Sequence, residues 1–102
     1  MKKVILSLLL IGSSIYSYAQ TISPEQMLKE KNCLACHAMS KKLVGPSFSD
    51  VKEKYANDPS AVSKLTKKII KGGSGVWGPV PMPANGQVNE AEAEILIKYL
   101  LK

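Results

Sequence analysis

The stretch Cys33-Leu34-Ala35-Cys36-His37 constrains this chain more than any other part of it. Two thiols one helical turn apart can add to the two vinyl groups of a porphyrin, and the next imidazole can then reach the iron. This Cys-x-x-Cys-His spacing is the attachment signature of c-type haem. The sequence therefore predicts one covalently bound haem c, with Cys33 and Cys36 as its thioethers and His37 as an iron ligand.

Other uses of a close cysteine pair fit this sequence less well. A thiol–disulfide redox pair would need a βαβ setting, whereas the patterns here are helical. A structural zinc site needs four ligands, but the chain has two cysteines and one histidine. A disulfide between Cys33 and Cys36 would close too small a loop to stabilise the rest of the chain.

The second iron ligand has to come from a residue other than histidine, because His37 is the single histidine. Met82 lies between two prolines, which stiffen the backbone on both sides of it. Met27 falls in an expected helix and is better suited to core packing, while Met39 is too close to His37 to reach around a porphyrin. We therefore predict His37/Met82 ligation, which raises the reduction potential and closes both axial positions. The expected chemistry is one-electron Fe(II)/Fe(III) transfer, not catalysis.

The patterns along the chain predict an all-α fold. Ser23 with Gln26, and Asn89 with Glu92, have the spacing of helix capping boxes. Two loops rich in glycine and proline, 43–46 and 72–88, separate the helices, and a loop as long as the second favours a functional role. The expected helices run from Ser23 to about Asn32, from near Ser47 to before Asn57, from Asp58 to Gly72, and from Asn89 to the C-terminus.

The first residues have the pattern of a secretory signal peptide. Lys2 and Lys3 precede an apolar run over 4–11, and a small-x-small site ends at Ala19. An uncleaved anchor would need ~20 apolar residues, which exceeds this run. We expect residues 1–19 to be cleaved, leaving a monohaem domain at 20–102 in the periplasm with no integral membrane segment.

The charge of the chain favours a protein partner over nucleic acid. The formal net charge is +6, and every basic residue is a lysine, whereas nucleic-acid recognition relies heavily on arginine. A lysine-rich surface suits salt-sensitive docking to an acidic redox protein, although lysines also simply keep a surface soluble. The lysines that flank the expected loops are the candidates for docking: Lys29, Lys31, Lys41, Lys42 and Lys71.

Three stretches together resemble one known family. Residues 33–38, Val44-Gly45-Pro46 and 75–83 are similar to the small bacterial class I cytochromes c of the cytochrome c-551 (cytochrome c8) type, and the resemblance covers residues 24–102. It implies a cytochrome c fold with about four short helices wrapped around one haem. It also implies a soluble, monomeric carrier that delivers electrons to a terminal oxidase, a nitrite reductase or a cytochrome c peroxidase.

The resemblance also implies roles for residues around the haem. The Pro46 carbonyl would accept a hydrogen bond from His37 Nδ1, which orients the ring. The Asn85 amide would donate to the Met82 sulfur, and the Trp77 indole would donate to a haem propionate.

The sequence departs from the family pattern at two positions. Lys68 stands where an arginine would bind a propionate, and a lysine cannot make the same bidentate contact. Ala84 replaces a second proline after Met82. Two other functions stay open: a haem subunit of a larger respiratory complex, and a ligand-binding sensor or peroxidase. The latter would need a distal acid–base residue, and the chain has neither a second histidine nor an arginine.

Overall fold

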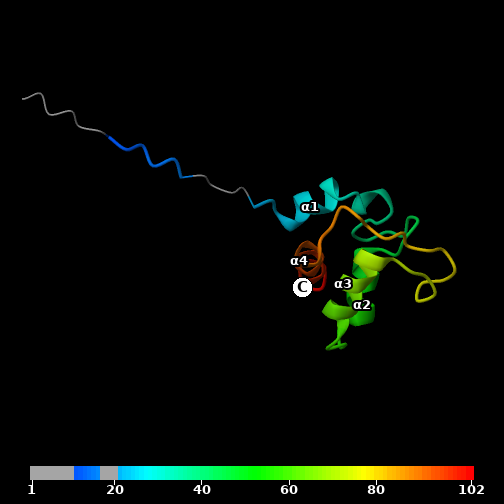
Figure 1. The fold of residues 1–102 in the computed structure, drawn as a ribbon. Coiled ribbons are helices and arrows are strands. Elements are labelled where there is room, and N and C mark those ends of the chain that lie inside the picture. The colour runs from blue at the N-terminus through cyan, green and yellow to red at the C-terminus, as the bar shows by residue number, and fades with distance from the viewer. Residues whose placement is uncertain (1–10, 17–20) are drawn as a thin grey trace, which may run out of the picture.

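The computed structural model describes residues 11–16 and 21–102, and within these ranges the protein is helical with no strand. The elements in chain order are α1 (Pro24–Glu30), the 3₁₀ turn η1 (Cys33–Ala35), α2 (Phe48–Tyr55), α3 (Ala61–Lys71) and α4 (Glu90–Leu100). Figure 1 shows the helices gathered together, with residues 11–16 leading away from them. The all-α prediction is confirmed, whereas the predicted cleavage site at Ala19 lies outside the described residues. None of the described helices is long and apolar enough to span a membrane.

The first helix is shorter than predicted. Ser23 Oγ accepts a hydrogen bond from Gln26 N at 3.1 Å, as an N-cap should. The Gln26 side chain does not return to the cap but donates to Glu30 at 2.8 Å, so only half of the predicted capping box forms. The helix ends at Glu30 because Asn32 adopts a left-handed backbone with φ 62°, which turns the chain toward Cys33.

Local hydrogen bonds from side chains determine where the other helices begin. Ser47 caps α2 by accepting from Asp50 N at 3.1 Å. The predicted capping box of α4 is confirmed, since Asn89 Oδ1 accepts from Glu92 N at 2.9 Å and Glu92 Oε2 from Asn89 N at 3.1 Å. The prediction that α3 begins at Asp58 is wrong. The carboxylate of Asp58 instead binds the backbone and hydroxyl of Ser60 in a turn, and α3 begins at Ala61.

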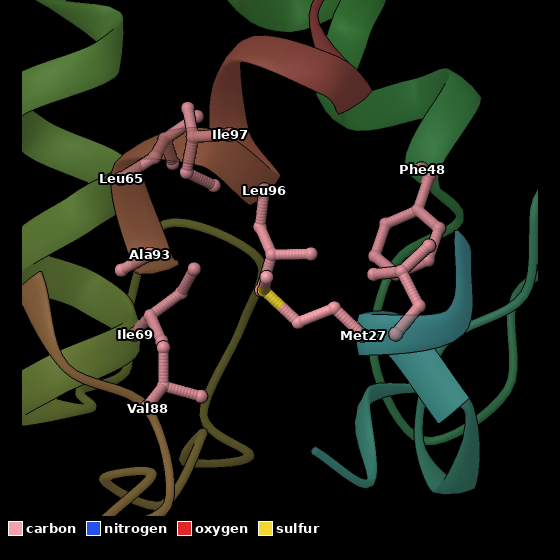
Figure 2. Close-up of a cluster of buried hydrophobic side chains, with 9 residues drawn as sticks. Met27, Phe48, Leu65, Ile69, Val88, Ala93, Leu96 and Ile97 are labelled. Carbon is pink, nitrogen blue, oxygen red and sulfur yellow. The ribbon is translucent and has the colours of Figure 1, made fainter. Parts of the chain in front are cut away.

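The core lies where α4 packs against α1 and α3. Leu96 and Ala93 of α4 have no exposed surface, and they belong to one cluster with Met27 of α1 and Ile69 of α3. Figure 2 shows the side chains of Leu96 and Met27 directed toward each other. Met27 is therefore a core residue, as predicted.

Candidate functional site

Two segments on one side of the core border a large cavity of the described structure. We call residues 33–46 the attachment segment and residues 72–86 the Met82 loop (Figure 1). The cavity has a volume of about 610 Å³, and Cys33, Cys36, His37 and Met82 all line it. Core residues such as Leu96 border it from within. The structure thus brings together the four residues that were predicted from separate parts of the sequence.

The two cysteines lie on one short turn. His37 N and Cys36 N both donate to Cys33 O, at 3.0 and 3.3 Å, so the thiols are one turn apart along the chain. No disulfide joins them. Burial raises the pKa of the Cys33 thiol above its ordinary value, and a backbone hydrogen bond partly opposes that shift.

The imidazole of His37 is fixed on three sides. Its Nδ1 lies 2.7 Å from Pro46 O, and because a carbonyl can only accept, Nδ1 carries a proton; in the neutral ring this leaves the lone pair on Nε2. The ring stacks on Phe48 with centroids 5.1 Å apart. A Cβ atom on Gly45 would lie 2.5 Å from His37 Cε1, so only glycine fits there.

Met82 is held by its backbone. Gly73 N donates to Met82 O at 2.9 Å and Met82 N donates to Gly73 O at 2.8 Å, which ties the methionine to the end of α3. Gly72 ends α3 with φ 70°, and a Cβ there would lie 2.4 Å from Met82 O. Asn85 N donates to Ile69 O at 2.9 Å. These bonds place a half-buried thioether at a defined point of the cavity wall.

Asn85 and Trp77 both line the cavity. The Asn85 side-chain amide donates to Lys31 O at 2.9 Å, a partner other than the Met82 sulfur that the resemblance implies, and the second N–H of the amide remains for other acceptors. Trp77 is 44% exposed, and the Lys54 ammonium lies 5.4 Å from its ring centroid.

The lysines near the site differ in whether other residues of the chain bind their ammonium groups. Lys68 and Lys42 line the cavity, and the Lys68 ammonium lies close to Gly73. Lys31 is not a free docking residue, because its ammonium donates to Gln87 O at 2.9 Å and lies 3.5 Å from a Glu92 carboxylate oxygen. The other candidates, Lys29, Lys41 and Lys71, are exposed.

Sequence reasoning missed several residues that shape the site. Phe48 carries a helical spacing signal that indicates only a core position, and nothing local marks it as the partner of His37. The bonds between Lys31 and Gln87 span 56 residues of chain, so no spacing rule could find them. Gly45 was part of the quoted pattern, but its contact with the imidazole depends on the folded loop.

The cavity and its lining fit a haem. Its volume lies within the ~300–1,000 Å³ typical of cofactor sites, and much of its lining is apolar, as a porphyrin requires. The donor set is a thiol pair, an imidazole with a free Nε2 lone pair, and a thioether, which are ligands that haem proteins use. Val44, Val76 and Val80 line the cavity and are exposed. No neighbour in the described part of the chain covers these apolar side chains, so a bound haem would cover them. The fold and the site together define a small helical protein built around one covalently held haem.

Comparison with known proteins shows to which family the chain belongs. The cytochrome c family model matches residues 25–102. Cytochrome c-551 of Pseudomonas aeruginosa is 43% identical over 97 residues, which cover 95% of this chain and 92% of the relative. Cytochrome c-552 of Hydrogenobacter thermophilus is 51% identical over 81 residues, 79% of this chain and 82% of the relative. The crystal structure of Nitrosomonas europaea cytochrome c552 matches with a TM-score of 0.73 at 43% identity, covering 76% of this chain and 95% of that one.

The chain belongs to the cytochrome c family. The predicted resemblance to cytochromes c-551 and the predicted cytochrome c fold are both confirmed. As a member of this family the protein carries one covalent haem c, and the Cys33/Cys36 pair fits the attachment motif. It is a haem-based electron carrier rather than an enzyme.

Proposed function

We propose that the protein is a soluble periplasmic shuttle whose haem iron is bound by His37 and Met82. The observation that carries the proposal is the shared cavity, because His37 and Met82 line it together with both cysteines. In this proposal Cys33 and Cys36 form the thioether bonds. The bound haem supplies a one-electron Fe(II)/Fe(III) couple.

The protein's own residues then have separate tasks. Pro46 O accepts a hydrogen bond from His37 Nδ1 at 2.7 Å, which orients the imidazole and would make Nε2 a stronger ligand for iron. The Gly73–Met82 backbone pair presents the thioether. With both axial positions taken, oxygen and peroxide have no open site, which favours electron transfer over catalysis.

Asn85 and Trp77 complete the proposed site. The free N–H of the Asn85 amide would donate to the Met82 sulfur while the other N–H stays on Lys31 O at 2.9 Å. The indole of Trp77, a donor only, would bind a haem propionate. The ammonium of Lys68 is available at the same cavity for a single, non-bidentate contact.

The proposed shuttle works as a monomer outside the cytoplasm. Residues 1–19 would act as a cleaved signal peptide and residues 20–102 as the haem domain. Its partners would be redox proteins with acidic docking surfaces, such as a terminal oxidase, a nitrite reductase or a cytochrome c peroxidase. Without Lys2 and Lys3 the formal net charge falls from +6 to +4, and this positive charge supports such docking, which should weaken as salt rises.

Absorption spectra of the haem-loaded protein test this proposal. Oxidised wild type should show a weak far-red band from sulfur bound to ferric iron. Met82→Ala should lose the band, and the control Met39→Ala should keep it, because Met39 is exposed and far along the chain from the loop. If wild type lacks the band, or if its reduced iron readily binds carbon monoxide, the sixth position is open and a sensor or peroxidase role has to replace the shuttle.

A further inference from the structure

A set of hydrogen bonds joins the residues just before the attachment segment to the chain at the end of the Met82 loop. Asn85 Nδ2 donates to Lys31 O at 2.9 Å, Lys31 Nζ to Gln87 O at 2.9 Å, and Asn32 Nδ2 to Gln87 Oε1 at 3.1 Å. Gln87 N also donates to Asn85 Oδ1 at 3.0 Å, which folds this piece of chain on itself. We call these four residues, Lys31, Asn32, Asn85 and Gln87, the clamp.

The clamp lies next to both sides of the haem site. Asn32 directly precedes Cys33, and Asn85 follows Met82 closely in the chain. The left-handed backbone of Asn32, φ 62°, turns the chain where its amide meets Gln87. A shift of residues 85–87 away from residues 31–32 would break all three bonds between them at once.

The clamp is also connected to α4. The Lys31 ammonium lies 3.5 Å from Glu92 Oε2, the same carboxylate oxygen that accepts from Asn89 N. The side chains of Lys31 and Glu92 are only 22% and 28% exposed, so this ion pair is less screened than a fully exposed one. Lys31 is therefore the member that connects the clamp to α4.

The two ends of the Met82 loop are fixed in different ways. The Gly73–Met82 backbone pair joins the beginning of the loop, just after α3, to Met82. The clamp, with the Asn85 N to Ile69 O bond, fixes the end. Without the clamp's side chains, the loop would be held mainly from α3 and could lift together with its thioether.

We propose that the clamp holds the Met82 loop closed and so sets how readily an outside ligand displaces Met82 from the iron. Lys31 and Gln87 are thus positioning residues that act through the loop. The inference depends on the proposed His37/Met82 ligation. A net hydrogen bond changes an opening equilibrium by about two- to tenfold, so loss of clamp bonds should raise the affinity for a displacing ligand by that order per bond.

Imidazole binding to the oxidised, haem-loaded protein measures the opening directly. Lys31→Met removes both the hydrogen bond from Lys31 Nζ to Gln87 O and the ion pair with Glu92. It should raise the affinity for imidazole about tenfold. Gln87→Ala removes only the bond to Asn32, and should raise it about threefold. The matched control is Lys64→Met, which removes a 2.8 Å ion pair with Asp58 remote from the loop and should leave the affinity unchanged.

The outcomes separate the clamp from the ligation it rests on. Denaturant unfolding of each variant shows whether it is folded, and Gln87→Ala remains as a mild test if Lys31→Met is not. If wild type shows the far-red band but both clamp variants bind imidazole no better than Lys64→Met, the clamp proposal alone is wrong. If wild type lacks the band, the ligation and the clamp proposal are both wrong.

Discussion

The attachment segment and the Met82 loop border one cavity, but they are held in different ways. The attachment segment bonds to itself and to the start of α2, through Gly45 N to Cys36 O at 2.8 Å and Phe48 N to Ala38 O at 2.9 Å. The Met82 loop is fixed at its two ends. Between residues 74 and 81, in the structure as described, the backbone adds a single bond, Gly75 N to Gly78 O at 2.8 Å. The histidine side of the site is therefore built locally, and the methionine side depends on distant partners.

This difference has a consequence for how the site responds to change. Local unfolding starts where few bonds hold the backbone, so the Met82 loop should open before the attachment segment does. Substitutions in the loop should alter the methionine side of the site while leaving the imidazole in place. Substitutions in the attachment segment should have the opposite effect.

Gly72→Ala should have the largest effect on the loop. Its φ of 70° is unfavourable for alanine, and the new Cβ would meet Met82 O at 2.4 Å and Ala84 N at 2.7 Å, both backbone atoms. The expected cost is about 2–4 kcal/mol of unfolding free energy. Thermal unfolding together with the far-red band should show the band lost well below the main transition. Gly86→Ala is the control, because its Cβ would meet nothing within 4 Å, and an equal loss there would contradict the steric explanation.

Gly45→Ala tests the histidine side. The new Cβ would lie 2.5 Å from His37 Cε1, so the ring has to move from its place between Pro46 O and Phe48. Overpacking of this kind costs about 1–3 kcal/mol. Nuclear magnetic resonance of the His37 ring protons should show the displacement, while the Met82 band persists. The neighbouring Val44→Ala, at a side chain 61% exposed, should leave the ring signals in place.

Ser47→Ala acts at the junction of the attachment segment and α2. Ser47 is buried, and its hydroxyl accepts from Asp50 N at 3.1 Å. Loss of an N-cap costs about 1 kcal/mol, which denaturant unfolding can measure. Because the change lies outside the Met82 loop, imidazole affinity should stay at the wild-type value. Ser63→Ala, on the exposed surface of α3, should be neutral, and a cost as large as that of Ser47→Ala would rule out the capping account.

Lys54→Met should give the smallest effect, at the middle of the loop. An exposed cation 5.4 Å from the Trp77 centroid contributes about 0.5–1 kcal/mol. Its loss should speed hydrogen exchange at the single indole N–H by about two- to fivefold. Lys52→Met removes the same charge from the same helix. If it speeds exchange equally, charge alone and not the contact with the ring is responsible.

The sequence predicted best those parts that depend on neighbours in the chain. The Cys-x-x-Cys-His turn, the start of a helix near Ser47 and the cap at Asn89 are fixed by residues a few positions apart, and the structure has them. The start of α3 failed because the Asp58 side chain competes for the backbone of Ser60, a choice that propensity does not resolve. At Ser23 only half of the capping box forms, because the Gln26 side chain donates to Glu30 and not to the Ser23 backbone.

The contacts that cross the cavity could not be predicted from spacing. The Asn85 amide reaches Lys31 across 54 residues, and Phe48 stacks on His37 only because the attachment segment folds back on α2. Pro46 was predicted correctly as the partner of His37 Nδ1, but from resemblance and not from the pattern itself. Local chemistry thus predicted the candidate site, and the tertiary fold decides which side chains support it.

The most direct test of the account is proton magnetic resonance of the reduced, haem-loaded protein. A methionine methyl bound over a porphyrin is shifted far upfield by the ring current, outside the range of ordinary methyl groups. We predict one such three-proton signal in wild type, absent from Met82→Ala and retained in Met39→Ala. An upfield methyl that survives in Met82→Ala, or no such signal in wild type, would contradict the central claim that Met82 is the second ligand.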